Sequence, residues 1–160
     1  MTDTAFSAER FAFTSQALST LGTDPAWDAA LSRYLRLESL THADAEFGAY
    51  AKANEADDLA RLALEEKYGK AFRSNPEAAE KWGALHERMN AAERTQLETY
   101  VKPMWEAGRR LALTPAPTLA AAVFKGNFIH REEIWNDNQF EADAMAIVTA
   151  DFARLAGEPL

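Results

Sequence analysis

The sequence predicts an all-α protein in which a long antiparallel helical hairpin packs with shorter C-terminal helices. The 160 residues include only seven glycines and six prolines, and these separate long runs of Ala, Leu, Glu, Arg and Lys, the residues that favour helices. No stretch shows the alternating apolar and polar pattern of a half-buried strand. The one short β-prone stretch, residues 146–149, lies inside a run with helical spacing.

The N-terminal segment, residues 1–22, is expected to be a short helix or a loose arm. A helix over about residues 7–21 would end at Gly22, the residue type that most often follows a helix. Its apolar side chains are Phe6, Phe11, Phe13, Leu18 and Leu21.

The hairpin is assigned to residues 23–113. Its first arm begins at Asp24-Pro25, where an N-cap carboxylate precedes a proline at the first helical position. Apolar residues then recur at spacings of three and four, which predicts one buried stripe. With no proline before Pro76, the helix either continues or breaks near Gly48 or Asn54. The stripe comprises Trp27, Leu31, Tyr34, Leu35, Leu40, Phe47, Tyr50 and Ala51, and in a continuous helix also Leu59, Leu62, Ala63 and Tyr68.

The second arm begins at Asn75-Pro76, which repeats the cap-then-proline signal. Pro103 has no N–H to donate, so it is expected to kink or restart the helix. The arm should stop at the Thr-Pro-Ala-Pro sequence of residues 114–117. Its stripe comprises Ala79, Trp82, Leu85, Met89 and Ala92, then Leu97, Val101 and Met104.

Residues 114–160 are expected to form a helical pair packed as one domain with the hairpin. Thr118 should cap a helix that runs through Phe124 or on to Trp135, weakened in its middle by Gly126-Asn127. A last helix is expected from about Phe140, with Met145, Val148, Phe152 and Leu155 on one face and Gly157 as the residue after its end.

Composition excludes several chemistries. Without cysteine, the chain cannot form a disulfide, a thiolate nucleophile or a cysteine-ligated zinc site. The net charge of −8 repels a nucleic-acid backbone, so direct nucleic-acid binding is not expected. Residues 1–4 show no secretory signal pattern, and no run approaches the ~18 apolar residues of a membrane span. We therefore expect a cytoplasmic bacterial protein that does not enter a membrane.

No catalytic or cofactor-binding motif occurs: there is no P-loop, Rossmann glycine pattern, zincin helix or nucleophile elbow. The prediction is a protein that is not an enzyme, with no catalytic, cofactor-binding or metal-binding residue assigned. The only metal candidates are Glu38, His42 and Glu46, which share a helical face at spacings of four. The same spacing is typical of a solvated acidic helix. Paired Glu-x-x-His elements, which a di-iron bundle requires, are absent.

The remaining histidines and the tryptophans have structural interpretations. His86, four residues after Trp82, is expected to cover an apolar face, and His130 to contact a carboxylate within residues 130–133. Glu132 and Glu133 would act as an acid–base pair only in a cleft that perturbs their pKa values; otherwise they form a solvated corner. Core packing is expected for all four tryptophans, with one or two as interface anchors in the alternative. These are Trp27, Trp82, Trp105 and Trp135.

Residues 114–157 resemble a group of small uncharacterised proteins from alphaproteobacteria, often encoded among phage-like or mobile genes. The resemblance is carried by Thr114-Pro115-Ala116-Pro117-Thr118-Leu119-Ala120-Ala121, Lys125, Glu133, Trp135 and Asp151-Phe152-Ala153-Arg154-Leu155-Ala156-Gly157. It implies a variable helical N-terminal half before the proline-containing break, but no biochemical role and no functional residue. Gly126-Asn127 departs from the continuous helix expected there and predicts a local kink.

By elimination, the predicted function is a non-enzymatic protein–protein interaction, as an adaptor or a self-assembling protein that could form a homodimer. One alternative is an acidic inhibitor or DNA mimic of a nucleic-acid-binding protein, favoured if two acidic clusters share a face. A third is a metal-dependent enzyme using Glu38, His42 and Glu46. The clusters are Asp44, Glu46, Glu55, Asp57 and Asp58, and Glu132, Glu133, Asp137, Glu141 and Asp143.

Overall fold

A computed structural model describes residues 3–137 and 139–157, without the side chains of residues 3–8 and of Phe11. The described residues are all-α, with helices and no strand, as predicted. The expected roles of the Phe6 and Phe11 side chains fall outside the described part. The elements are α1 (Asp3–Leu18), α2 (Pro25–Phe47), α3 (Ala49–Tyr68), η1 (Phe72–Ser74), α4 (Pro76–Gln96), η2 (Leu97–Val101), α5 (Lys102–Leu113), α6 (Leu119–Arg131), η3 (Ile134–Asn136) and α7 (Ala144–Ala156).

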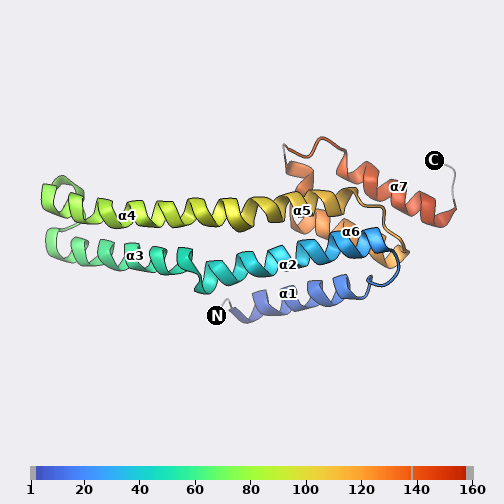
Figure 1. Ribbon diagram of the computed structural model, residues 1–160, viewed down its shortest axis with the longest axis horizontal. Helices are drawn as coiled ribbons and strands as arrows, with labels where there is room; N and C mark the ends of the chain where they lie inside the picture. The colour runs from blue at the N-terminus through green and yellow to red at the C-terminus, as the bar shows by residue number, and fades with distance from the viewer. Residues whose placement is uncertain (1–2, 138, 158–160) are drawn as a thin grey trace. The chain divides into compact units, whose positions relative to one another are not determined.

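The chain divides into two compact units, each built from its own contacts (Figure 1). The terminal unit comprises residues 1–36 and 105–160, and the hairpin unit comprises residues 37–104. In the hairpin unit α3 and α4 lie side by side and run in opposite directions, which confirms an antiparallel helical hairpin. The packing of the C-terminal helices on that hairpin stays a prediction.

An aromatic cluster forms the core of the terminal unit. The ring of Phe124 lies 5.1 Å from that of Phe13 and meets Trp27 edge-on at 6.2 Å, while Tyr34 meets Phe128 edge-on at 4.9 Å. Such offset and edge-on contacts add to the free energy gained by burying the rings. The polar edge of Trp27 is satisfied as well, because its Nε1–H donates to the Thr20 hydroxyl at 2.9 Å.

The predicted helix starts are confirmed by their capping hydrogen bonds. The Asp24 carboxylate accepts from the N–H groups of residues 26 and 27 at 2.9 Å, and Asn75 and Thr118 accept from the residues three further on at 3.1 and 3.2 Å. Each cap satisfies backbone donors that the first helical turn leaves without a partner. The helix that precedes the cap at Asp24, α1, ends at Leu18 rather than at the expected Leu21. The chain then turns through Gly22 at φ 82°.

The first arm of the hairpin breaks at Gly48, one of the two places expected. At φ −80° and ψ −165°, Gly48 is extended between the last residue of α2 and the first of α3. A Cβ at this position would lie 2.6 Å from the Cα of Asp44, closer than a side chain can approach backbone. The break therefore depends on glycine.

The second arm remains helical from Pro76 to Leu113, but its hydrogen bonding changes ahead of Pro103. Residues 97–101 form a π-helical turn, and α5 begins at Lys102. A proline inside a helix lacks the N–H for the normal bond, and its ring clashes with the carbonyl four residues earlier. A wide turn at this place relieves both problems, and the expectation that Pro103 restarts the helix is confirmed.

The C-terminal helices correct two expectations. The kink predicted at Gly126-Asn127 is wrong, because both residues lie within α6. Buried neighbours on this helix, such as Phe124 and Phe128, outweigh the roughly 1 kcal/mol by which glycine disfavours a helix. α7 begins at Ala144 rather than near Phe140, since the carboxylate of the preceding residue caps it. Its end is as predicted, with Gly157 left-handed at φ 77°.

Among the described residues, no helix combines the length and apolar character needed to cross a membrane.

Candidate functional site

The four tryptophans differ in exposure, and two of them do not pack in a core. Trp27 is fully buried and Trp82 is half-buried, whereas Trp105 and Trp135 are 51% and 59% exposed. The expectation of core packing is therefore wrong for these last two. Helical spacing places a residue on a face, but only the tertiary fold decides whether another element covers that face.

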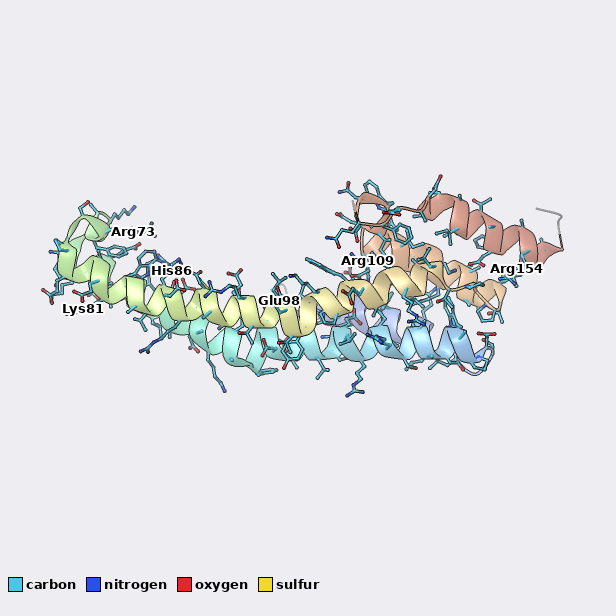
Figure 2. The ribbon with its side chains drawn as sticks, turned by 45° about the horizontal axis from the view of Figure 1, so that its top comes forward. Arg73, Lys81, His86, Glu98, Arg109 and Arg154 are labelled. Atoms are coloured by element: carbon cyan, nitrogen blue, oxygen red, sulfur yellow. The ribbon has the colours of Figure 1, made fainter. Side chains whose placement is uncertain are left out.

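The hairpin unit is held together by a short ladder of stacked side chains. The imidazole of His86 stacks on Trp82 with ring centres 4.4 Å apart, and the rings of Phe72 and Trp82 meet edge-on at 5.9 Å. Arg73 lies over the same indole at 4.2 Å, and His86 Nδ1 lies 3.4 Å from Asp57 Oδ2 of α3. Figure 2 shows Arg73 near the turn and His86 further along α4. The expectation that His86 covers an apolar face is confirmed.

Apart from this ladder, the hairpin unit buries little. Among its described residues only Glu38, Asp57, Phe72 and Ala78 are buried. Two helices packed side by side cover one face of each other and leave their outer faces without a neighbour. Apolar side chains on those outer faces therefore take no part in the packing of the hairpin unit itself.

One such face runs along α3. Glu55, Leu59, Leu62 and Glu66 follow one another at spacings of four, three and four, so they lie in one row on the helix. All four are exposed, and the exposed fraction is 61% for Leu59 and 53% for Leu62. On the helical wheel this row lies opposite Asp57, the residue that faces α4. We call these four residues the α3 ridge.

The structure thus corrects the expected core role of Leu59 and Leu62. That expectation extended the stripe of the first arm into one continuous helix. The break at Gly48 interrupts the helical phase, so the residues of α3 that face inwards follow a different register. Phe47, the last residue of α2, is also outside the core and is 74% exposed.

The charges beside the ridge are of two kinds. Arg61 lies between Asp58 and Glu65 and donates to each carboxylate at 3.2 Å. These contacts, the hydrogen bond to Asp58 first, raise the pKa of the guanidinium. Glu55 and Glu66 have no hydrogen bond or ion pair within the described part of the chain. The ridge therefore consists of two leucines between two free carboxylates.

The metal candidates do not form a site. Glu38 is buried, His42 is half-buried and Glu46 is exposed. Over the residues that the structure covers, no group of three or more His, Asp or Glu side chains could hold a metal ion. The structure therefore offers no support for a metal-dependent reaction at these residues.

The acidic clusters are partly neutralised by local partners. Asp58 pairs with Arg61 at 3.2 Å, Asp137 with Arg109 at 2.8 Å and Glu132 with Arg131 at 2.6 Å. The first cluster belongs to the hairpin unit and the second to the terminal unit. These contacts reduce the free charge on which a DNA mimic would depend.

The carboxylate contact expected of His130 is wrong. The ring is exposed, and no carboxylate among the described residues pairs with it. Glu132 binds the neighbouring Arg131 instead, and Arg–carboxylate pairs form strong, charge-assisted hydrogen bonds.

A buried polar cluster in the terminal unit was not predicted. Lys125 of α6 is fully buried, and its Nζ donates to Asp151 Oδ2 of α7 at 2.5 Å and to the carbonyl of Thr114. Asp151 Oδ1 accepts from the N–H of Ala116 at 3.1 Å and from Arg154 at 3.0 Å. Burial lowers the pKa of Lys125, and Asp151 opposes that shift. The cluster fastens α7 to α6 and to the turn before it.

The expected apolar face of α7 explains why this cluster was missed. Val148 is buried as predicted, but Met145 is 65% and Phe152 is 37% exposed. The buried face of α7 contains Val148 and Asp151, because Asp151 forms an ion pair with the buried Lys125. The only sequence signal is that Asp151 lies three residues after Val148, which places it on the inner face.

Comparison with known proteins gives no relative from which a function could be transferred: no protein-family model, no curated protein and no solved structure matches this chain.

Proposed function

We propose that the protein is a non-enzymatic interaction protein whose α3 ridge binds a helix of a protein partner. The observation that carries this proposal is the exposure of Leu59 and Leu62, 61% and 53%, side by side on the outer face of the hairpin. Single exposed apolar residues are common on protein surfaces. Two leucines in one row, on a hairpin with few buried residues, form a face that a partner helix can cover.

The energetics favour a helical partner. Covering one leucine completely is worth about 1.5–3 kcal/mol, and leucines three residues apart present their side chains as neighbouring knobs. An amphipathic helix docks through such anchors when it lies along an apolar strip. Because the hairpin already presents the ridge on regular helix, little conformational entropy is lost on binding.

The charges of the ridge favour a basic partner over a second copy of this chain. Glu55 and Glu66 lie one turn beyond the leucines at either end. If two identical ridges paired through their leucines, a glutamate of one copy would lie against a glutamate of the other at both ends, whether the helices ran parallel or antiparallel. Like charges in contact are unfavourable. A partner helix with two apolar residues between Lys or Arg residues matches the ridge in shape and in charge.

The test is affinity capture from a nuclease-treated bacterial lysate with matched variants. The double variant Leu59→Ser and Leu62→Ser should lose a partner that the wild type retains at high salt. Its control is Leu113→Ser with Leu119→Ser, which removes two leucines that are 55% and 56% exposed in the terminal unit. A retained protein supports the proposal only if it contains a basic amphipathic helix and if Glu55→Lys with Glu66→Lys also abolishes its capture.

Other outcomes decide against the proposal. If both double variants capture the same proteins as the wild type, the ridge is not the binding surface. If sedimentation shows a wild-type dimer that Leu59→Ser with Leu62→Ser dissociates, the ridge serves self-association. A captured DNA-binding protein that elutes with salt and ignores the leucine changes would favour the acidic mimic, because exposed charge contacts are screened.

A further inference from the structure

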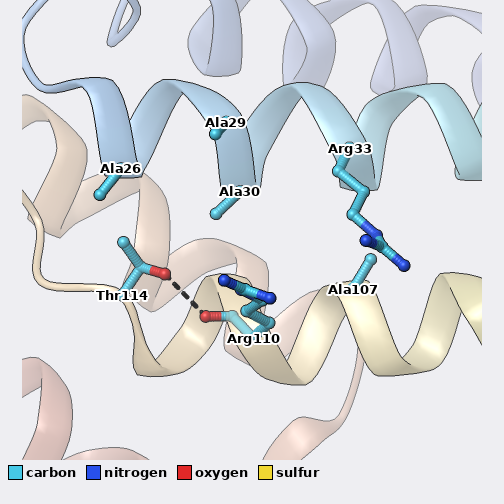
Figure 3. A pocket seen from close by; sticks show the side chains of 7 residues that line it. All are labelled: Ala26, Ala29, Ala30, Arg33, Ala107, Arg110 and Thr114. Carbon is cyan, nitrogen blue, oxygen red and sulfur yellow. Dashed lines mark hydrogen bonds between the residues drawn. The ribbon is translucent and has the colours of Figure 1, made fainter.

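A pocket opens in the terminal unit between the first turns of α2 and the second half of α5 (Figure 3). Its volume is about 270 Å³. The walls are apolar and short, because four of the lining residues are alanines and leave the space between the two helices unfilled. The lining residues are Ala26, Ala29, Ala30, Arg33, Ala107, Arg110 and Thr114. We call it the α2–α5 pocket.

Two arginines line this pocket, one from each helix. Arg33 extends from α2 towards α5, and Arg110 extends from α5 towards α2 (Figure 3). Both are exposed, and neither has a hydrogen bond or ion pair through its guanidinium among the residues described. The third polar side chain needs no ligand, because the Thr114 hydroxyl donates to the carbonyl of Arg110 at 2.8 Å.

Arg33 and Arg110 lack the carboxylate partner that some other arginines of the terminal unit have. Arg109, next to one of them in sequence, binds Asp137 at 2.8 Å, and Arg154 binds Asp151 at 3.0 Å. In a chain with 25 acidic and 17 basic residues, carboxylates to pair with are plentiful. At this pocket the fold places two cations beside an apolar hollow and no acidic side chain in its lining.

We propose that the α2–α5 pocket binds an acidic segment of a partner protein. The segment places one carboxylate between Arg33 and Arg110 and a neighbouring apolar side chain against the alanines. Guanidinium groups present several donors in one plane and bind carboxylates through paired hydrogen bonds. The two arginines therefore favour an anionic side chain, and the alanine walls favour an apolar side chain next to it in the bound segment.

The size of the pocket indicates a side chain rather than a cofactor. Pockets for small molecules and cofactors commonly measure about 300–1,000 Å³ and enclose most of their ligand. At about 270 Å³ and open to solvent, this pocket fits one anchor residue of a peptide. The inference goes beyond the α3 ridge, since it concerns another unit and a partner of opposite charge.

The experiment is a titration of the full-length protein, followed through the side-chain Nε–Hε signals of its arginines by NMR. The probe is a terminally blocked five-residue peptide with one glutamate between two leucines, and its counterpart carries glutamine instead. The glutamate peptide should shift the signals of Arg33 and Arg110 in a saturable manner. The glutamine peptide should bind about tenfold more weakly, as expected when a charged hydrogen-bond partner is lost.

Variants distinguish the pocket from general charge attraction. Arg33→Gln and Arg110→Gln should each raise the Kd of the glutamate peptide about tenfold. The control Arg88→Gln removes an exposed arginine of the hairpin unit and should leave the Kd unchanged. Ala29→Leu, at an exposed lining residue, keeps both charges but fills the hollow, and it should weaken binding as well.

Three results would overturn the inference: equal binding of the two peptides, equal effects of Arg88→Gln and Arg33→Gln, or a wild-type dimer that Arg110→Gln dissociates. The last result would make a second copy of the chain the occupant. Leu59→Ser with Leu62→Ser should leave peptide binding unchanged, so failure at the α3 ridge and failure at this pocket are separate outcomes.

Discussion

Lys125 and Asp151 form an ion pair with 2.5 Å between Nζ and Oδ2, and their side chains are 0% and 7% exposed. Removing two charges from water costs several kcal/mol per ion, which their mutual attraction recovers only when the remaining hydrogen bonds are also made. Here they are made, because the carbonyl of Thr114 accepts from Lys125 and the N–H of Ala116 donates to Asp151.

The first prediction concerns the loss of one member of this pair. Lys125→Met removes the buried cation of Asp151 and leaves only the more exposed Arg154 as its partner. The free energy of unfolding should therefore fall, by up to the roughly 3–5 kcal/mol that breaking a buried pair costs. The double variant Lys125→Met with Asp151→Asn should regain much of that loss, because no buried charge remains and the amide oxygen can still accept from Ala116. Urea denaturation followed by circular dichroism measures both values.

A strictly additive double variant would contradict this view, since the two side chains would then not be coupled. The control is Arg154→Gln. Arg154 also contacts Asp151, but its side chain is 43% exposed, and its loss should cost less than the loss of Lys125.

The second prediction concerns the pH dependence of the pair between Arg109 and Asp137. The hydrogen bond from Arg109, followed by that from the N–H of Gln139, lowers the pKa of Asp137. A carboxyl group with a lowered folded-state pKa stabilises the fold above its unfolded pKa of about 3.9, and this contribution is lost as the pH falls through the folded-state pKa. Asp137→Asn should therefore be less stable than wild type at pH 7 by about 0.2–1 kcal/mol, the range of partly exposed ion pairs.

The difference between wild type and Asp137→Asn should shrink to nothing as the pH falls below the unfolded pKa and through the lowered folded-state pKa. Urea denaturation over this range, or titration of the Asp137 carboxyl by NMR, measures it. A difference that is constant with pH would mean that asparagine disturbs the packing and that the charge contributes nothing.

Local features of the fold were predictable from sequence because their causes are local. The caps at Asp24, Asn75 and Thr118 depend on a side chain and on backbone donors two or three residues away. Gly157 ends α7 for a similar reason, since glycine adopts the left-handed conformation without strain. Nothing distant in the chain has to be known for these assignments.

Features that depend on tertiary contacts were not predictable in the same way. A continuous stripe predicts Leu59 and Leu62 in the core, which is wrong, because helical spacing does not show where the phase of the helix is interrupted. Trp135 is exposed for a related reason: within the described part of the chain, no element buries it. The burial of Lys125 depends on an aspartate 26 residues further along the chain, and the α2–α5 pocket depends on two helices that meet only in the folded unit.

The third prediction tests the break between α2 and α3. A Cβ at residue 48 would lie 2.6 Å from the Cα of Asp44 and 1.9 Å from its Oδ1. Gly48→Ala should lower the free energy of unfolding by about 1–3 kcal/mol, as other forced overpacking does. The matched control is Gly83→Ala in α4, where a Cβ meets nothing within 4 Å, and it should raise stability by about 1 kcal/mol. Chemical denaturation of the two variants measures both changes, and equal gains from both would show that the break does not need glycine.

The fourth prediction separates the exposed leucines of α3 from the core. Leu59→Ala and Leu62→Ala remove side chains that are 61% and 53% exposed, so each should change the free energy of unfolding by no more than about 0.5 kcal/mol. Leu31→Ala removes a side chain that is 0% exposed, and it should cost about 2–5 kcal/mol because a cavity is left behind. Urea denaturation at low protein concentration compares the three variants with wild type. A large loss from the α3 variants at low concentration would place these leucines in a core. A loss that appears only at high concentration would show that copies of the chain cover them, since association stabilises the folded state by mass action.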